Sequence, residues 1–483
     1  MLTIVREYLQ GPGLAILPEM ELVLFALGLF LFSGWKDAAG RAWSASLALA
    51  GVAFSGYTVW IVHTRIAARG DFAGLGGSVL ADSSFIFFAA VLLAGTGLAV
   101  LLLADECEPS PSAYALLLLA AAGMLLMVSG VHLASIFVGF EWVTGSVFLV
   151  AALMQARPRA SASGWISARL LMAAVIATAL LACGFLVLYR ITGSANLGQI
   201  AFVFGIPAAK GAPAPYPSLT AAAFGLVLAG IFAKFAVLPF QPWNGAKRHD
   251  LGRAMPAFVS GTVLIAAFVL LLRLAVVVFV IRSGYRRTAF LGLAVAVVLL
   301  GVLAIARRLT WRQFLGYAAV VQAGLLMLAA GAQNDAGLGA AAFLALVLIF
   351  AVSGGFAVAS LAPSRAAEAV SQAILIATLA GAPLTGGYIA RREAWTALHH
   401  AGSPWLAWVS TLAGLPILYG GIRSLLSGGA KPLCTDELPA GVPEHTTLSL
   451  PALFVLTVSL FVCLAAGLYS EPFLRFARYA FGI

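Results

Sequence analysis

Long apolar runs are the feature that most constrains the fold of this chain. Runs of about 20 residues with few charges recur from residue 14 to residue 468, and a helix of that length crosses the hydrocarbon core of a bilayer. The runs are continuous rather than alternating, which favours helices over a β-barrel because a spanning helix satisfies its own backbone hydrogen bonds. The sequence therefore predicts an all-α membrane protein with about 14 transmembrane helices.

We place the predicted spans at residues 14–33, 43–63, 80–103, 112–129, 131–154, 167–189, 218–242, 254–281, 288–305, 314–331, 337–361, 371–390, 404–427 and 448–468. The run 112–154 is divided in two because one crossing needs only about 20 residues. The first span lacks a cleavage signal in the expected place, so we expect a retained helix. The longest polar segments, 191–217 and 428–447, are too short and too rich in Pro and Gly to form a soluble domain.

Charges and cysteines narrow the classes of partner and cofactor. The net charge of +10 comes mainly from arginines in the loops, which favours phospholipid headgroups and a companion subunit rather than nucleic acid as partners. The cysteines show no C-x-x-C spacing and no nearby His pair, so we expect no metal and no iron–sulfur cluster. Phosphate-binding, dinucleotide-binding, zinc-protease and nucleophile-elbow motifs are absent from the sequence, so we expect no cofactor and no catalytic residue in this chain.

Lys234 is the one lysine of five that falls within a predicted span. A lysine at a helix centre costs about 2.5 to 3.5 kcal/mol on insertion scales, but a buried lysine, unlike arginine, can release its proton. Pro239 follows five residues later and interrupts helical hydrogen bonding. We therefore hypothesise that Lys234 carries protons beside a hydrated helix break. The alternative is a lysine that snorkels to the membrane interface.

Glu141, in the segment "VGFEWVTGS", lies deep in the run 112–154 and is the best candidate partner for Lys234. A carboxylate and an ammonium group that face each other stabilise each other's charged form, and a proton moving nearby changes the pKa of both. Such a pair would act as a switch. The alternative for Glu141 is a neutral carboxyl that makes one interhelical hydrogen bond.

A second break is predicted at "LAGAPLTGGYIARREAW", residues 379–395, where Pro383 is followed by two glycines and then by Arg391 and Arg392. Arginines at a helix end are often interfacial anchors. The nearby polar residues are candidates for ordering a water chain, although most such groups hydrogen-bond their own helix. They are Gln322, Ser353, Gln372, Thr378 and Thr385.

A faint internal repeat accompanies the two breaks. The segments "SIFVGFEW" and "RQFLGYAA" both enter a span as F-x-G-aromatic, at residues 135–142 and 312–319. Paired broken helices in two halves of a chain are typical of transporters built from repeats, with the site at the breaks.

Several segments resemble a known family. The chain is similar to the antiporter-like membrane subunits of respiratory complex I, and most closely to the subunit N group of bacterial NADH:quinone oxidoreductases. The K-x-x-x-x-P-F-x-x-W and A-G-x-P-x-T-x-G-[FY] patterns are fairly specific to this superfamily. The matching segments are "GGSVLADSSFIFF", "ASIFVGFEW", "LYRITGSANLGQIAF", "KFAVLPFQPW" through "AAFVLLLR", "RQFLGYAAVVQAG" and "LAGAPLTGGYIARR".

The resemblance implies a fourteen-helix subunit with two inverted five-helix repeats, spans 4–8 and 9–13, each with a proline-broken helix. It implies an N-terminal three-helix segment at 1–110, repeats at 111–282 and 283–428, and a C-terminal helix at 429–483. It also implies that Glu141 and Lys234 form the proton-coupling pair, with a further translocation residue at Arg391.

Two positions depart from the family pattern. Leu264 stands where the family places a central lysine, and Arg391 stands where the family has a terminal Lys or Glu. Ser260 and Thr262, which are near Leu264 in the sequence, are candidates for holding water. Leucine cannot bind a proton, and arginine stays charged. The proton relay implied by the resemblance is therefore incomplete unless water bridges these positions.

The resemblance implies a membrane-arm subunit that takes part in proton translocation coupled to quinone reduction, in the inner membrane of a bacterium. Flavin, iron–sulfur clusters and quinone are expected in partner subunits, and the partners are other membrane subunits of the complex. One alternative is a subunit of a related cation/proton antiporter, membrane-bound hydrogenase or inorganic-carbon pump. Another is a non-pumping structural subunit.

Overall fold

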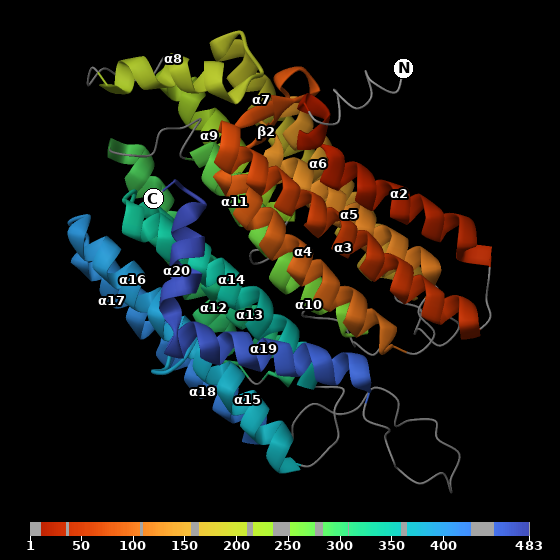
Figure 1. Cartoon of the computed structure of the whole chain (residues 1–483). Coiled ribbons are helices and arrows are strands. Elements are labelled where there is room, and N and C mark those ends of the chain that lie inside the picture. The colour runs from red at the N-terminus through yellow and green to blue at the C-terminus, as the bar shows by residue number, and fades with distance from the viewer. Residues whose placement is uncertain are drawn as a thin grey trace, which may run out of the picture.

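The computed structural model describes residues 11–34, 38–106, 110–155, 164–209, 216–234, 252–275, 284–307, 309–358, 365–426 and 449–482. Nearly all of these residues are helical, and the helices pack side by side in one tilted array (Figure 1). Among them, eleven helices are long and apolar enough to cross a membrane. The predicted all-α membrane fold is confirmed, whereas the count of fourteen crossings and the two inverted repeats stay predictions.

The N-terminal part begins with the 3-10 turn η1 (Pro12–Ala15) and contains helices α2 (Leu17–Leu31), α3 (Ala38–Arg69) and α4 (Ser83–Ala104). The short turn η2 (Phe32–Gly34) follows α2. A small hairpin that the sequence analysis did not predict joins α3 to α4. Its strands β1 (Phe72–Gly74) and β2 (Val79–Ala81) pair antiparallel around the turn η3 (Leu75–Gly77).

The middle of the chain forms α5 (Pro111–Ser129), α6 (Leu133–Gln155), α7 (Gly164–Thr192), α8 (Leu197–Ala209) and α9 (Pro217–Lys234). The eighth predicted span is three consecutive pieces: α10 (Ala254–Ala257), the π-helix η6 (Phe258–Val263) and α11 (Leu264–Arg273). Helix α8 was not predicted, because its thirteen residues are too few for a crossing.

The remainder forms α12 (Gly284–Ile305), α13 (Trp311–Gly331), α14 (Asp335–Val358), α15 (Arg365–Ala380), α16 (Gly386–His400), α17 (Pro404–Leu412), α18 (Gly414–Leu426), α19 (Leu450–Leu468) and α20 (Ser470–Tyr479). The predicted span 371–390 is thus two helices, α15 and α16, and α16 continues to His400. The predicted span 404–427 is also interrupted, at Ala413. The sequence analysis did not predict that second interruption or α20.

Glycines let neighbouring helices approach closely. A methyl group on Gly139 of α6 would lie 3.0 Å from the backbone nitrogen of Met127 in α5, and one on Gly324 of α13 would lie 2.9 Å from that of Val298 in α12. Because lipid gives apolar helices no hydrophobic reason to associate, such small-residue contacts drive packing in membranes. They explain why α5 pairs with α6 and α12 with α13.

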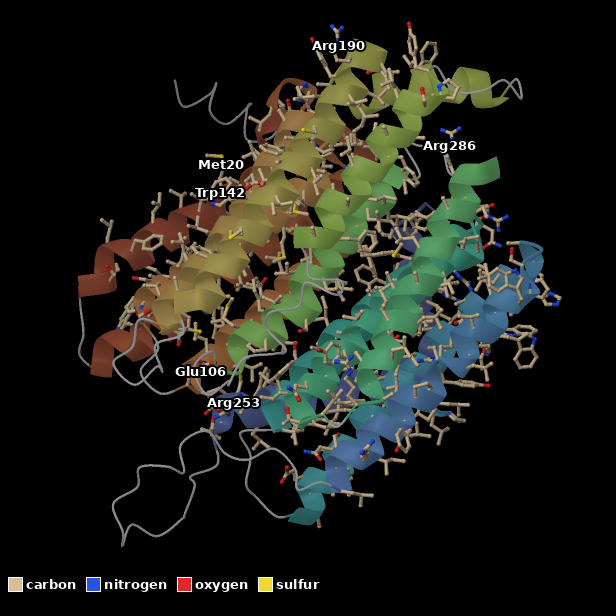
Figure 2. The ribbon with its side chains drawn as sticks, turned by 180° about the vertical axis from the view of Figure 1, so that it is seen from behind. Met20, Glu106, Trp142, Arg190, Arg253 and Arg286 are labelled. Atoms are coloured by element: carbon tan, nitrogen blue, oxygen red, sulfur yellow. The ribbon has the colours of Figure 1, made fainter. Side chains whose placement is uncertain are left out.

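Charged side chains gather at the two ends of the helix array. Arg190 and Arg286 lie at one end, and Glu106 and Arg253 lie together at the other (Figure 2). The carboxylate of Glu106 accepts hydrogen bonds from the backbone nitrogens of Arg253 at 2.7 Å and Ala254 at 2.8 Å, while Asp105 forms an ion pair with Arg253 at 2.9 Å. Carboxylates at a helix N-terminus are favourable. These contacts fix the start of α10 against the end of α4.

Candidate functional site

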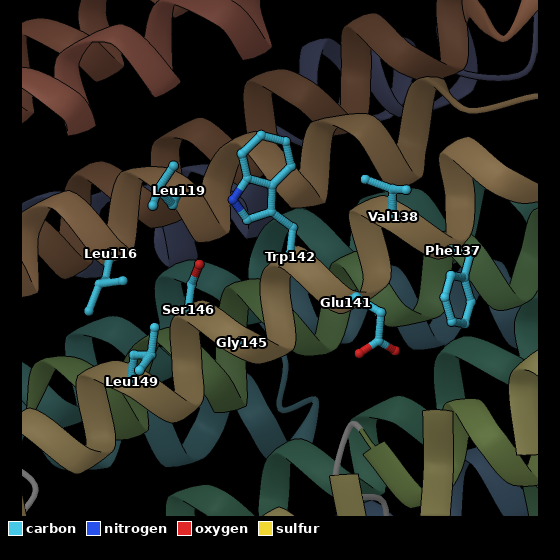
Figure 3. A pocket seen from close by; sticks show the side chains of 9 residues that line it. All are labelled: Leu116, Leu119, Phe137, Val138, Glu141, Trp142, Gly145, Ser146 and Leu149. Carbon is cyan, nitrogen blue, oxygen red and sulfur yellow. The ribbon is translucent and has the colours of Figure 1, made fainter. Parts of the chain in front are cut away.

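Glu141 lies near the middle of α6 and faces α7. The hydroxyl of Thr178 in α7 donates a hydrogen bond to Oε1 of Glu141 at 2.8 Å and also lies 3.0 Å from the carbonyl of Ala174. The Glu141 side chain is half-buried, and its carboxylate points away from Trp142 (Figure 3). A carboxyl group is thereby held at a defined place within a predicted span by an uncharged partner on the next helix.

An open, mainly apolar groove of about 450 Å³ borders Glu141. Its walls come from α5 and α6, and Ser146 is the other polar side chain on them (Figure 3). The apolar walls are formed by Leu116, Leu119, Phe137, Val138, Trp142 and Leu149, with Gly145. Because such surroundings offer few hydrogen-bond partners, the bond from Thr178 matters for holding the carboxyl group of Glu141 in place.

Helices α7 and α9 run antiparallel in close contact, and their register indicates which residues of α7 lie beside residue 234. The backbone of Gly184 in α7 lies against Val227 in α9, and Gly230 lies against Leu181 one turn further on. Continuing this register by one more turn along each helix brings the backbone of residue 234 to the level of Thr178. The hydroxyl that bonds Glu141 therefore lies level with position 234.

Lys234 is the last described residue of α9. Its side chain and Pro239, the first predicted break, lie outside the described residues. The distance between Lys234 and Glu141 therefore stays untested, and so does the predicted interruption of the helix at Pro239.

The eighth predicted span contains a π-helix where the family pattern has a lysine. Leu264 is buried and begins α11 directly after the π-helical residues, which include Ser260 and Thr262. The buried Thr262 hydroxyl has no hydrogen-bond partner in the described part of the chain. Elsewhere helical threonines bond the carbonyl four residues back, as Thr96 bonds Leu92 and Thr144 bonds Phe140.

The π-helix explains why the Thr262 hydroxyl lacks the bond that Thr96 and Thr144 make. A π-turn shifts the backbone bonding from four to five residues, so the carbonyls sit differently along the helix. Single π-turns within α-helices are frequent at functional sites. An unpaired buried hydroxyl costs about 1 to 3 kcal/mol and is a natural partner for an internal water molecule. Thr262 therefore has the chemistry to hold water, and its assignment as a relay residue stays a prediction.

Pro383 lies in the interruption between α15 and α16. Gly381 has a φ of 74°, and the backbone nitrogen of Ala382 donates to the carbonyl of Ala377 at 2.8 Å, which is the pattern of a glycine-terminated helix. The Thr385 hydroxyl donates to the carbonyl of Ala382 at 2.7 Å. Thr385 thus closes its own turn.

Arg391 on α16 is 6% exposed and reaches back to the same interruption. Its Nη2 donates to the carbonyl of Leu379 at 2.9 Å, and its Nη1 lies 3.0 Å from the carbonyl of Ser410 and 3.4 Å from that of Thr411. The amide of the buried Gln322 in α13 also donates to the carbonyl of Leu379. The structure therefore brings Arg391 and Gln322 together at one backbone carbonyl.

The other polar candidates are also buried. Ser353, Gln372 and Thr378 are each at most 2% exposed. Thr378 bonds the carbonyl of Ile374 in its own helix at 2.9 Å, and Gln372 bonds Glu368 at 3.1 Å. These two bonds of Thr378 and Gln372 stay within their own helix, as the alternative for such residues expects.

Sequence reasoning missed two carboxyl groups in the first turns of α2. Glu19 is 5% exposed and accepts a hydrogen bond from the Ser129 hydroxyl at 3.1 Å. Glu21 accepts one from the Thr58 hydroxyl at 2.8 Å. The available signal was the spacing: two acids within the first eight residues of a predicted span. This spacing alone does not indicate burial, because charges near a span end commonly reach water.

Comparisons with known proteins place this arrangement in a family. Residues 129–415 match the family described as "NADH:quinone oxidoreductase/Mrp antiporter, TM". The NADH-quinone oxidoreductase subunit N 2 of Solibacter usitatus is 24% identical over 489 residues, which cover 96% of each chain. The matched region contains both α6 with Glu141 and α16 with Arg391.

Two solved structures share the fold over nearly the whole length. A chain of the Mrp complex from Dietzia has a TM-score of 0.77 at 20% identity, with 96% of each chain covered. A chain of respiratory complex I from Thermus thermophilus has a TM-score of 0.72 at 22% identity, covering 95% of this chain and 98% of that one. The family model spans more than half of the sequence, so this chain belongs to the NADH:quinone oxidoreductase/Mrp antiporter transmembrane family.

Proposed function

We propose that this chain is a membrane-arm subunit of an NADH:quinone oxidoreductase, similar to subunit N, and that it takes part in proton translocation coupled to quinone reduction. The observation that carries the proposal is the carboxyl of Glu141, held by Thr178 in a predicted span at the level of residue 234. Family membership and near-complete coverage by a subunit N relative support it.

The proposed chemistry is proton exchange between titratable groups. A carboxylate at Glu141 and an ammonium group at Lys234 would stabilise each other by opposite charge. The Thr178 hydroxyl donates a hydrogen bond to Glu141 and holds the carboxyl group in place. A change at one group therefore alters proton binding at the other, which is what coupling of transport requires.

In this proposal the redox chemistry belongs to other subunits. Flavin, iron–sulfur clusters and quinone would be held by partners, and the membrane would be the bacterial inner membrane. The direct partners would be neighbouring membrane subunits and phospholipid. The enzyme activity is thus that of the complex, and this chain contributes proton movement.

Two variants test the proposal. Lys234→Ala and Glu141→Gln are expected to lower the number of protons moved per electron while the complex still assembles and oxidises NADH. Proton uptake into vesicles and NADH oxidation would be measured on the same preparation. Glu471→Gln, which changes an exposed carboxylate on α20, is the control. Unchanged proton stoichiometry in both variants, with assembly intact, would refute the proposal.

A second candidate is a subunit of a multi-subunit cation/proton antiporter, membrane-bound hydrogenase or inorganic-carbon pump. The fold shared with a chain of an Mrp complex supports this second candidate. Purification of the complex with identification of its subunits separates the two, because the first predicts flavin and iron–sulfur subunits together with neighbouring homologous large membrane subunits. A non-pumping subunit is the third candidate, favoured by the buried, apolar Leu264.

A further inference from the structure

The interruptions of two helices meet around one side chain. Helix α15 ends at Ala380 before Gly381, and α17 ends at Leu412 before α18 begins at Gly414. The last turn of any α-helix leaves carbonyl groups without partners in the helix. In a membrane interior such groups must be satisfied by the protein. Leu379, Ser410 and Thr411 each present such a carbonyl near these two ends.

The guanidinium group of Arg391 satisfies all three carbonyls, at 2.9, 3.0 and 3.4 Å. The C-terminal end of α15 carries partial negative charge and stabilises a cation there, and the one-residue interruption after α17 adds two carbonyl acceptors. Arginine suits the position because its planar group offers five donors in a fixed fork. Arg391 is therefore held from two directions inside the protein.

Two glycines pack closely against the Arg391 side chain. A methyl group on Gly414 would lie 2.7 Å from Nη1 of Arg391, and one on Gly381 would overlap the same side chain. A larger residue at either position would displace the arginine. Gln322 of α13 also bonds the carbonyl of Leu379, so side chains from α13 and α16 meet at the end of α15.

The charge at this junction is not neutralised by an acid in the described part of the chain. The nearest acid in sequence, Glu393, pairs instead with Arg392 at 2.8 Å and with Arg478 at 3.3 Å. The partners of Arg391 are all neutral carbonyls. A full positive charge therefore stays in the protein interior, and arginine cannot release it as a proton.

We propose that Arg391 is a fixed cation that closes the interruption between α15 and α16 to protons and other cations. A proton approaching this junction meets a buried like charge, which arginine does not lose by deprotonation. Arginine and helix dipoles form such barriers in channels. The inference rests on the proposed function in that it assigns proton movement to the Glu141 region and excludes it at Arg391.

The test measures passive proton leak in proteoliposomes that contain the whole complex, with a pH step imposed and no NADH present. Arg391→Gln keeps an amide donor for the carbonyls and removes the charge. Its leak is expected to rise roughly tenfold or more above that of the unmodified complex. Arg392→Gln, which changes the exposed neighbour, is the matched control and should leave the leak unchanged.

Arg391→Lys provides a second measurement, the pH dependence of the leak, which would not change if Arg391 had a purely structural role. Lysine keeps the positive charge and a donor, but it can lose its proton when buried. The leak of this variant is expected to increase as the pH rises, in excess of the pH dependence shown by the unmodified complex. A leak equal to that of the unmodified complex at every pH, in an assembled Lys variant, would overturn the inference, and so would an assembled Gln variant that does not leak.

The two proposals fail separately. Passive leak is recorded without turnover, so it does not depend on whether Glu141 and Lys234 pump. Unchanged stoichiometry in the Glu141 and Lys234 variants, together with a leak in Arg391→Gln, would refute the proposed function alone. Reduced stoichiometry in those variants, together with no leak from the Gln variant, would refute the barrier alone.

Discussion

Glu19 carries a buried carboxyl group with one hydrogen bond. Its Oε1 accepts from the Ser129 hydroxyl at 3.1 Å, and its Oε2 has no partner in the described part of the chain. An ionised carboxylate with an unpaired buried oxygen costs far more than a neutral carboxyl in the same place. We therefore expect that an uncharged side chain of the same shape is tolerated at position 19, between α2 and α5.

This predicts that Glu19→Gln, which keeps an oxygen for Ser129 and carries no charge, leaves the thermal stability of the purified complex unchanged or higher. Ser129→Ala removes the hydrogen bond and is expected to destabilise by about 1 kcal/mol. The midpoint of thermal unfolding measures both. A Gln variant less stable than the Ser129→Ala variant would show instead that the charge of Glu19 is present and compensated.

Single residues also show what the sequence could and could not reveal. Glu141 was identifiable because a carboxylate deep in an apolar run is costly and rare. The burial of Arg391 could not be predicted from the sequence. The predicted span ends at residue 390, which would put the arginine at an interface. The helix in fact continues to His400, so the same residue lies inside. Whether a charge is buried thus depended on where the interrupted helix ends.

At the scale of elements, close helix contacts position the proposed pair. A methyl group added to Gly230 would lie 2.8 Å from the backbone nitrogen of Leu181 and 3.0 Å from the carbonyl of Ala177. Lys234 lies one turn beyond Gly230 on α9, and Thr178 is next to Ala177 on α7. Any displacement of α9 at Gly230 therefore changes where residue 234 lies relative to Thr178.

Gly230→Ala is therefore expected to push α9 away from α7 and to lower proton stoichiometry. Gly225→Ala on the same helix is the matched control, because a methyl group there would have nothing within 4 Å. In the control, helix propensity alone favours alanine by about 0.5 to 1 kcal/mol. Proton uptake per electron and thermal midpoint would be measured for both. Equal behaviour of the two variants would contradict a role for this contact.

Breaks in helices were predictable where proline and glycine stand together within a span, as around Pro383. The interruption at Ala413 also carries such a signal, because Gly414 follows it directly and Pro416, which has no backbone N–H, cannot donate to the carbonyl of Leu412. The approach of Arg391 to Gly414 is a tertiary contact, which periodicity and composition do not report. The π-helix at Thr262 carries no clear local signal.

At the scale of the whole molecule, the short amphipathic helix α20 joins parts far apart in the sequence. Tyr479 lies 3.0 Å from Nδ1 of His63 in α3, and Arg478 forms an ion pair with Glu393 of α16 at 3.3 Å. Phe476 packs on Phe87 of α4 with ring centroids 4.8 Å apart. Helix α20 thus links the N-terminal helices to the interrupted helix that carries Arg391.

Truncation after Tyr469 removes this link, and we expect less assembled complex with a lower thermal midpoint. The loss has two physical causes. The ring of Phe87 loses one of its two aromatic neighbours, a contact worth about 0.5 to 1.5 kcal/mol beyond its area. Glu393 also keeps only its exposed partner Arg392. Native electrophoresis and thermal unfolding measure the two effects. Arg475→Ala is the control, because its ion pair with Glu471 is exposed and such pairs contribute little. A truncated chain that assembles with an unchanged midpoint would show that α20 packs on the bundle without holding its two parts together.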